Sequence, residues 1–316
     1  MRNLLYLVIP CYNEEEVLME TSRQLKIKMN NLIESQKIDS KSKIAFVNDG
    51  SKDKTWELIQ ELCGESQLFE GINLAHNVGH QHALLAGLLT VNNDADMIIS
   101  LDADLQDDIN VIDEMVEEYH NGYEIVYGVR KERTTDTKFK KWTAESFYKL
   151  MGKMGVEIVY NHADYRLMSK RAVEELSQYN EVNTFLRGII PTIGLKNTKV
   201  YYDRKERFAG ESKYPLKKML EFAFEGITSF SVKPIRLITM IGAGLISLSF
   251  LLMIYSLVRY VQGNIVTGWT SLILSIWLIG GVLMLALGII GEYVGKIYLE
   301  VKQRPRYIVM ERINND

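Results

Sequence analysis

Short apolar runs alternate with amphipathic stretches over the first part of the chain. The apolar runs are bounded by polar or turn-forming residues, which is typical of buried β-strands, and we expect strands at residues 4–9, 44–47, 71–74, 97–101 and 125–127. The stretches between them predict helices at residues 14–31, 54–63, 81–89 and 109–120. Strands that alternate with helices usually form one sheet of mostly parallel strands. The pattern therefore predicts an α/β fold in which helices cover both faces of a mostly parallel sheet.

Two long apolar stretches follow, at residues 237–258 and 269–291, and Arg259 is the only Asp, Glu, Lys or Arg within them or between them. Each stretch has about the 20 residues that a helix needs to cross the hydrocarbon core of a bilayer, about 30 Å thick. A buried hairpin of a large soluble domain is the alternative interpretation. Tyr255, Tyr260 and Trp269 lie near the ends of the stretches, as is typical of membrane interfaces. We therefore expect two transmembrane helices.

Basic residues lie on both outer sides of this predicted hairpin. They are Lys217, Lys218, Lys233, Arg236, Lys296, Lys302, Arg304, Arg306 and Arg312. Because basic residues concentrate on the cytoplasmic side of a membrane, we expect a multi-pass protein with both termini cytoplasmic. The predicted organisation is a cytosolic domain at 1–214, an amphipathic juxtamembrane region at 215–236, a hairpin at 237–291 and a cytoplasmic tail at 292–316. The juxtamembrane region would either lie on the membrane or pack against the domain.

Composition and the missing motifs argue against several classes of function. The chain has 37 Lys and Arg and 40 Asp and Glu residues, and its net charge of −3 argues against nucleic acid as a partner. Its two cysteines, Cys11 and Cys63, are too few for a disulfide framework. Neither a Walker phosphate loop nor a Gly-x-Gly-x-x-Gly motif follows the first strand, which argues against ATP hydrolysis and a Rossmann dehydrogenase.

Acidic residues directly follow the fourth predicted strand, where Asp102 and Asp104 are followed by Gln106, Asp107 and Asp108. Clustered carboxylates next to buried apolar residues repel one another unless a cation or hydrogen bonds offset the repulsion. Oxygen ligands suit Mg²⁺ or Mn²⁺, so we expect a divalent metal site here. The alternative is a solvated acidic turn that caps the helix near residue 109, and for Asp107 and Asp108 both interpretations stay open.

Eight short motifs follow one another along the chain, at residues 9–14, 47–51, 77–81, 102–107, 128–130, 163–167, 185–188 and 204–214. Taken together and in this order, they resemble the motifs of the polyprenyl-phosphate glycosyltransferases, inverting enzymes with a GT-A catalytic fold that include undecaprenyl-phosphate glucosyltransferases and dolichyl-phosphate mannose synthases. The motifs span nearly the whole predicted cytosolic domain, and the two predicted spans match the glucosyltransferase branch. Asn48 stands where family members often have Asp.

The resemblance implies roles for individual residues. It places Pro10, Tyr12, Glu14 and Asp49 around the nucleotide, and the metal and diphosphate on Asp102, Asp104 and Gln106. It implies that Asp102, Asp104, Asp164 and Arg187 are catalytic. The other substrate-binding residues that it implies are Asn77, Gly79, Gln81, Ala103, Arg130, Arg204, Arg207, Ser212 and Lys213.

Elementary chemistry leaves some of these roles open. Glu14 is also explained as a charge near a helix start, and Asp49 as a turn residue. A phosphate monoester has a second pKa of about 6 and needs no general base, so Asp164 would orient a substrate or pair with Arg166. The planar fork of arginine matches phosphate oxygens, although a single arginine is as often only solvated. His80 and His82 are two residues apart and do not share a helix face, which argues against a histidine metal site.

The function that follows from the resemblance is transfer of a sugar from a nucleotide sugar to a polyprenyl phosphate, with inversion. UDP-glucose and undecaprenyl phosphate are the expected pair, in a bacterial-type cell membrane, and the lipid-linked sugar would serve cell-envelope glycosylation. The resemblance also implies a homo-oligomer. A processive polysaccharide synthase is an alternative, but the chain has neither the Gln-x-x-Arg-Trp motif nor the additional spans that it would need. A non-catalytic, nucleotide-sugar-binding membrane scaffold is the other alternative.

Overall fold

The computed structural model describes residues 2–131, 162–182, 184–203, 233–262 and 268–314. The chain divides into two compact units. The first consists of Met1–Tyr148, Glu157–Pro215 and Arg304–Asp316, and the second of Lys149–Val156 and Leu216–Gln303.

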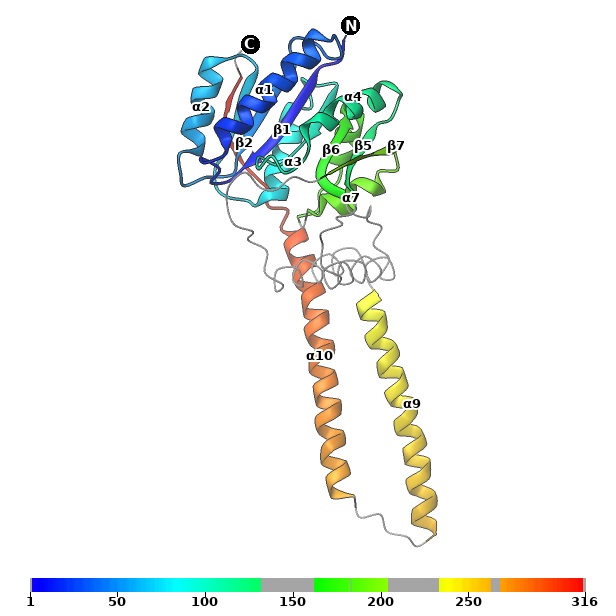
Figure 1. Ribbon diagram of the computed structural model, residues 1–316. Helices are drawn as coiled ribbons and strands as arrows, with labels where there is room; N and C mark the ends of the chain where they lie inside the picture. Colours follow the sequence, from blue (N-terminus) through cyan, green and yellow to red (C-terminus); the bar gives the residue numbers. More distant parts are fainter. Residues whose placement is uncertain (1, 132–161, 183, 204–232, 263–267, 315–316) are drawn as a thin grey trace. The chain divides into compact units, whose positions relative to one another are not determined.

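The first unit is built on an eight-stranded sheet with the strand order β7-β5-β6-β4-β1-β2-β3-β8 (Figure 1). Its strands are β1 (Leu5–Cys11), β2 (Lys43–Asn48), β3 (Phe69–Leu74), β4 (Met97–Ser100), β5 (Ile125–Arg130), β6 (His162–Ser169), β7 (Asn197–Tyr202) and β8 (Val309–Ile313). Strand β1 pairs in parallel with β2 and β4, β2 with β3, and β5 with β7. Strand β6 runs antiparallel to β4 and β5, and β8 antiparallel to β3. The predicted mostly parallel sheet is confirmed.

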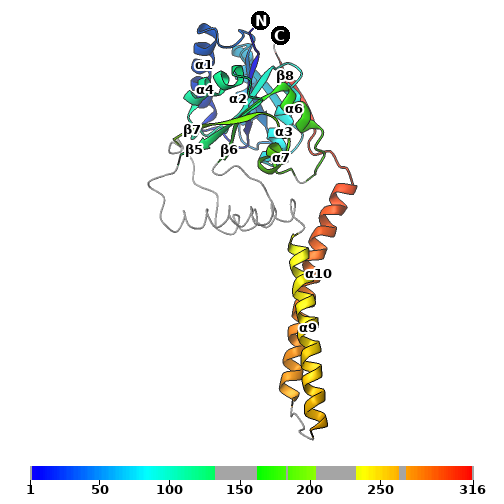
Figure 2. The same ribbon diagram turned by 90° about the vertical axis from the view of Figure 1, so that its right-hand side faces the viewer.

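Helices lie on both faces of the sheet, as Figure 2 shows. Those of the first unit are α1 (Leu18–Glu34), α2 (Thr55–Glu65), α3 (His80–Val91), α4 (Ile112–His120), α6 (Lys170–Ser177) and α7 (Leu186–Thr192), with a short 3₁₀-helix η1 (Ile109–Val111) before α4. The apolar residues of α1, α2 and α4 form one core cluster with alternate residues of the central strands, Leu5, Leu7 and Ile9 of β1 among them. Strands that are covered on both faces read as continuous apolar runs, and all seven residues of β1 are buried.

Helix α3 packs against the other face of the sheet and approaches it closely at Gly87. A methyl group placed on Gly87 would lie 2.5 Å from Cγ1 of Val8 and 2.7 Å from Cγ2 of Val47. No side chain larger than hydrogen fits there without displacing the two valines. This close contact holds the middle of α3 against β1 and β2.

Several elements differ from the sequence-based expectation, and β6, β7, α6 and α7 were not predicted. The first helix begins at Leu18 rather than at Glu14, because the Glu14 backbone N–H donates to Oγ1 of Thr55 at 2.9 Å and the chain from Tyr12 to Val17 forms a loop. The expected tail at 292–316 contains β8, which completes the sheet at the edge of β3. The tail expected at 292–316 is therefore not one separate segment, because residues 309–313 pair with β3 of the first unit, whereas the residues up to 303 belong to the second unit.

The second unit contains two long helices, α9 (Lys233–Val261) and α10 (Trp269–Val301). The predicted spans at 237–258 and 269–291 fall within these helices. One stretch, Leu278–Val301, is long and apolar enough to cross a membrane when the search covers the part of the chain that the structure describes. Two transmembrane helices therefore stay a prediction. The amphipathic region predicted at 215–236 lies outside the described residues up to 232.

Candidate active site

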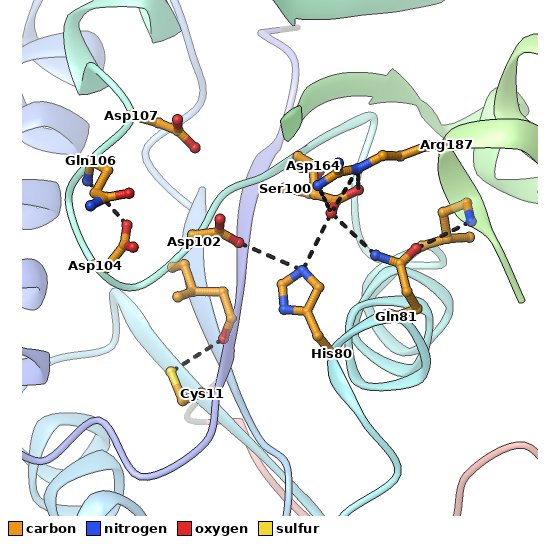
Figure 3. A network of polar contacts seen from close by, with 12 residues as sticks. Cys11, His80, Gln81, Ser100, Asp102, Asp104, Gln106, Asp107, Asp164 and Arg187 are labelled. Atoms are coloured by element: carbon orange, nitrogen blue, oxygen red, sulfur yellow. Dashed lines mark hydrogen bonds and ion pairs between the residues drawn. The ribbon is translucent and has the colours of Figure 1, made fainter. Parts of the chain in front are cut away.

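The first part of the site is the loop that leaves the sheet after β4. Asp102 and Asp104 lie on this loop, and the backbone N–H of Gln106 donates to Oδ1 of Asp104 at 3.1 Å (Figure 3). Oγ1 of Thr21 donates to the carbonyl oxygen of Ala103 at 2.7 Å and so ties the loop to α1. The three residues predicted to hold a metal, Asp102, Asp104 and Gln106, are therefore on one short loop with a defined backbone path.

Strand β6 brings Asp164 to the same edge of the sheet, although it is 62 residues further along the chain than Asp102. Because β6 runs antiparallel to β4 and Arg166 is in register with Ser100, residue 164 lies just beyond the carboxyl end of β4. Oγ of Ser100 donates to the carbonyl oxygen of Asp164 at 2.5 Å. The predicted metal loop and the predicted catalytic aspartate thus meet at one edge.

The Asp164 carboxylate is buried and held by several donors. Nη2 of Arg187 donates to its Oδ2 at 2.8 Å, Nε2 of Gln81 donates to the same oxygen at 3.1 Å, and Arg166 donates to Oδ1. Burial raises the pKa of this carboxyl group, but Arg187, His80 and Arg166 outweigh it and hold the pKa well below the usual range. Asp164 is therefore ionised at neutral pH and is a weak base, in keeping with the orienting role and the Arg166 pair that the sequence analysis left open.

Gln81 connects three elements. Its Nε2 contacts Asp164 on β6, and its Oε1 accepts a hydrogen bond from the backbone N–H of Leu186 at 3.2 Å, at the beginning of α7. Arg187 follows directly in the chain. Gln81 thus fixes the position from which Arg187 reaches Asp164, and a contact of Gln81 with substrate stays a prediction.

His80 is a site residue that the sequence analysis missed. Its Nε2 lies 3.6 Å from Oδ1 of Asp102 and 3.6 Å from Oδ2 of Asp164, so the imidazole stands between the two carboxylates (Figure 3). Although 43% of the His80 side chain is exposed, partial desolvation lowers its pKa, and the two neighbouring carboxylates outweigh this and raise the pKa. Its position as the first residue of α3, after a motif glycine, was the signal in the sequence.

The loop before His80 is held by Asp49 at the end of β2. The Asp49 carboxylate accepts hydrogen bonds from the backbone N–H groups of Val78 at 2.7 Å and Gly79 at 3.0 Å, and Nδ2 of Asn77 donates to the Asp49 carbonyl oxygen at 3.1 Å. Gly79 has φ +87°, which favours glycine. Asp49, Asn77 and Gly79 therefore form one bracket that places His80, in which the Asp49 carboxylate bonds a loop about 30 residues further along the chain rather than a local turn.

The residues predicted to surround the nucleotide lie at the ends of β1 and β2. Pro10 is inside β1, in register with Val47, and Tyr12 just beyond it has 41% of its surface exposed. The loop that contains Tyr12 and Glu14 contacts the loop after β2, because the Asn13 backbone N–H donates to Oγ of Ser51 at 3.1 Å. These residues share the edge of the sheet with Asp102 and Asp164, and their contact with a nucleotide stays a prediction.

A third group of residues joins the loop after β4 to the ends of β5 and β7. Nη2 of Arg130 donates to Oδ1 of Asp107 at 3.2 Å, and the hydroxyl group of Tyr202 donates to the same oxygen at 2.5 Å. Asp108, next in the chain, instead caps η1 by accepting a hydrogen bond from the Asn110 backbone N–H. Of the two acids for which both interpretations stayed open, one caps the helix and the other is buried in this cluster.

The remaining predicted substrate residues, Arg204, Arg207, Ser212 and Lys213, lie outside the described residues.

Comparison with known proteins identifies the family. A family model described as glycosyl transferase family 2 matches residues 6–177, which is more than half of the chain. The chain belongs to glycosyl transferase family 2. The matched residues include β1 to β4, the loop with Asp102 and Asp104, and Asp164 on β6, and the GT-A-like sheet is the one that the resemblance implied.

Curated relatives of this family 2 protein are similar over almost their whole length. An uncharacterized glycosyltransferase of Bacillus subtilis (strain 168), YkoT, is 56% identical over 306 residues, which cover 97% of this chain and 91% of the relative. The SfII prophage-derived bactoprenol glucosyl transferase of Shigella flexneri is 41% identical, with 96% of each chain covered. A prophage bactoprenol glucosyl transferase homolog of Escherichia coli (strain K12) is 39% identical, covering 96% of this chain and 97% of the relative. The predicted resemblance to polyprenyl-phosphate glycosyltransferases is confirmed.

The residues of the family 2 site fit a divalent cation in chemical type. Asp102, Asp104 and Gln106 supply carboxylate and amide oxygens, which are the ligands that Mg²⁺ and Mn²⁺ prefer. Oδ2 of the neighbouring Asp107 is buried and has no hydrogen-bond partner among the described residues. Burial also raises the pKa of Asp102, as expected for a carboxylate whose charge lacks a sufficient counter-ion. No three His, Cys, Asp or Glu side chains converge on one point within the described part of the chain, so a metal site stays a prediction.

Proposed function

We propose that this protein transfers a glucosyl group from UDP-glucose to undecaprenyl phosphate or a related polyprenyl phosphate, with inversion at the anomeric carbon. The observation that carries the proposal is the pairing of Asp164 with Arg187, next to the acidic loop of Asp102 and Asp104. The names of the Shigella and Escherichia relatives support glucose as the transferred sugar and a lipid as its carrier. Both relatives match this chain over almost its whole length.

The reaction joins an oxygen of the acceptor phosphate to the anomeric carbon of the sugar. The bond between that carbon and the diphosphate oxygen breaks, and UDP leaves with the electron pair. The acceptor is largely dianionic at neutral pH, because its second pKa is about 6, so no proton has to be removed. This fits the ionised, arginine-paired Asp164, whose low pKa makes it unsuited to act as a general base.

Arginine side chains supply what the two anionic substrates need. Arg187 has 33% of its side chain exposed while it contacts Asp164, so it can reach both the carboxylate and solvent. Asp164 would orient this guanidinium toward the acceptor phosphate, and His80 would keep Asp164 aligned with the acidic loop. A divalent cation held by Asp102, Asp104 and Gln106 would offset the charge that develops on the departing diphosphate.

We further propose that α9 and α10 anchor the enzyme in the cell membrane. The first unit, which carries the candidate site and is called the catalytic unit below, and both termini would then lie in the cytoplasm. The apolar stretch Leu278–Val301 supports a spanning helix in α10, and α9 has 29 residues, which is long enough to cross a bilayer. A membrane location brings the catalytic unit to an acceptor that is itself a lipid. A homo-oligomer, which the resemblance implied, is part of this proposal.

The test is incubation of membranes with radiolabelled UDP-glucose, undecaprenyl phosphate and Mg²⁺ or Mn²⁺, followed by organic extraction. The proposal predicts metal-dependent, acid-labile label in the lipid phase. The Asp104→Asn variant, which removes one predicted metal ligand, should lose most of the label and remain folded. Label in the lipid phase from another nucleotide sugar but not from UDP-glucose would overturn the donor, and no transfer with any donor would overturn the enzyme. Full activity of Asp104→Asn would refute the metal assignment.

A further inference from the structure

The proposed reaction assigns no role to the cluster of Asp107, Arg130 and Tyr202. The hydroxyl group of Tyr202 donates to Oδ1 of Asp107 at 2.5 Å, and Nε of Arg130 donates to the Tyr202 oxygen at 3.2 Å. Nη2 of Arg130 donates to Oδ1 of Asp107 at 3.2 Å. The three side chains therefore form a closed triangle of hydrogen bonds in which each one contacts the other two.

Burial shows which members are fixed and which one faces outward. The Tyr202 residue is 1% exposed and the Asp107 side chain 4%, whereas the Arg130 side chain is 25% exposed. Burial, followed by the adjacent Asp107 carboxylate, raises the pKa of Tyr202, so its hydroxyl group stays protonated and remains a donor. Two rigid, buried partners thus hold one arginine that reaches the surface.

The triangle engages a defined part of the guanidinium. Nε and Nη2 lie along one edge of the planar group, and both are used on Tyr202 and Asp107. The other N–H groups lie on the opposite side of the fork. Fixing one edge of an arginine in advance lowers the side-chain entropy that it loses when the other side binds a planar or tetrahedral oxyanion.

The position of the triangle relates this orientation to the active site. Asp107 directly follows Gln106 on the acidic loop, and Arg130 and Tyr202 are the last residues of the neighbouring strands β5 and β7. All three therefore lie at the edge of the sheet that carries Asp102 and Asp164. The ion pair between Asp107 on the acidic loop and Arg130 at the end of β5 is largely buried, and such a pair is a poor source of stability by itself. A positioning role is the better explanation for it.

We propose that Asp107 and Tyr202 are positioning residues that hold Arg130 so that its outer side binds a phosphate group of the substrates. The phosphate belongs to the nucleoside diphosphate or to the lipid monophosphate. The inference rests on the proposed function in that both phosphates belong to molecules that take part in that reaction, but it is tested by binding and does not require turnover.

The experiment is a double-mutant cycle on the full-length, detergent-solubilised protein. Calorimetry measures the Kd for UDP with Mg²⁺ and, separately, the Kd for farnesyl phosphate in wild type, Tyr202→Phe, Arg130→Ala and the double variant. Tyr202→Phe should weaken binding of one of the two ligands about tenfold, as expected when a hydrogen bond to a charged group is lost. The same change should have no effect on that ligand in the Arg130→Ala background, because Tyr202 acts through Arg130. The ligand that responds identifies the phosphate.

Tyr165→Phe is the matched control. The Tyr165 ring packs edge-on against Tyr202 with centroids 5.4 Å apart, and its hydroxyl group donates to the carbonyl oxygen of Asp108 at 3.1 Å. Like Tyr202→Phe, this substitution removes the hydroxyl oxygen of a buried tyrosine, but Tyr165 makes no bond to Arg130 among the described contacts. We expect Tyr165→Phe to leave both Kd values within about twofold of wild type, even if it lowers the Tm as much as Tyr202→Phe does.

Other results would overturn the proposal. Equal losses of affinity in Tyr165→Phe and Tyr202→Phe would show a packing effect. If Tyr202→Phe weakens binding as much in the Arg130→Ala background as in wild type, Tyr202 does not act through Arg130. If neither Kd depends on Arg130, that residue binds no substrate phosphate. Arg130→Lys keeps the charge but cannot bond through two N–H groups on one edge, so it should bind the ligand nearly as weakly as Arg130→Ala does. This variant tests the proposal even if Tyr202→Phe does not fold. Failure of glucosyl transfer with normal binding in this cycle would refute the proposed function alone.

Discussion

Arg312 of β8 is the partner of a carboxylate that is completely buried in the sheet. Nε of Arg312 donates to Oε1 of Glu70 on β3 at 2.7 Å, and its Nη2 donates to Oδ2 of Asp94 at 2.6 Å. Glu70 has no exposed surface, and its Oε2 has no hydrogen-bond partner among the described residues. Removing Arg312 would therefore leave a buried negative charge without its cation.

We predict that Arg312→Met strongly destabilises the catalytic unit. Breaking a buried ion pair by removing one partner costs about 3–5 kcal/mol, and the 30% exposure of the Arg312 side chain places this pair at the lower end, about 3 kcal/mol. For a domain of this size, each kcal/mol lowers the Tm by about 2–4 °C, so the expected decrease is about 6–12 °C. The assay is thermal unfolding of the detergent-solubilised protein, followed by a probe of the catalytic unit.

The pH dependence of this effect has a defined sign. Burial raises the pKa of Glu70 above its ordinary value of 4.5 even with Arg312 present, and loss of Arg312 would raise it further. A carboxyl group with a raised pKa binds more protons in the folded state than in the unfolded state, so its contribution to stability falls as the pH rises above about 4.5. The difference in Tm between wild type and Arg312→Met should therefore be larger at pH 8 than at pH 5.

The control is Arg23→Met, which removes an arginine from the ion pair with Glu20 on the surface of α1. The Arg23 side chain is 60% exposed, so this variant should show no measurable change in Tm. Replacing both buried partners, as in Glu70→Met with Arg312→Leu, should recover most of the lost stability. The reasoning is refuted if Arg312→Met lowers the Tm no more than Arg23→Met, or if the double replacement is less stable than Arg312→Met alone.

Two further predictions concern the core. Gly87→Ala should destabilise the catalytic unit by about 1–3 kcal/mol, because the new methyl group overlaps valine side chains of the sheet. The control is Gly64→Ala in α2, where the methyl group has open space and should raise the Tm. Equal Tm values for the two variants would contradict the packing described for Gly87. Burial raises the pKa of Cys63 to about 11 and that of Cys11 well above its usual range, and each residue is 1% exposed. Neither thiol should react with a disulfide reagent at pH 8 in the native protein, and both should react in denaturant, so rapid native labelling of either would refute its burial.

The parts of the fold that the sequence predicted are those that depend on neighbours along the chain. Apolar runs and amphipathic stretches placed β1 to β5 and the helices between them within a few residues. A strand that is buried on both faces gives a continuous apolar run, and a helix that is buried on one face gives apolar residues at helical spacing. Polar residues at strand ends indicated Asp102 and Asp104, since parallel strands bring their carboxyl ends to one edge. Asp164 was implied only by the family resemblance, because β6, on which it lies, was not predicted from the local pattern. Family membership followed from the order of these short motifs.

The parts that only the tertiary structure decided depend on partners far apart in the chain. Asp107 and Asp108 are adjacent and chemically alike, but one accepts from Arg130 and Tyr202 while the other caps η1, and no local pattern distinguishes them. Asp49 looks like a ligand residue in the sequence, yet its carboxylate holds the loop before His80. Strand β8 pairs with β3 across more than 200 residues. Such pairings depend on the register and burial of segments that meet only in the folded chain, and local periodicity carries no information about them.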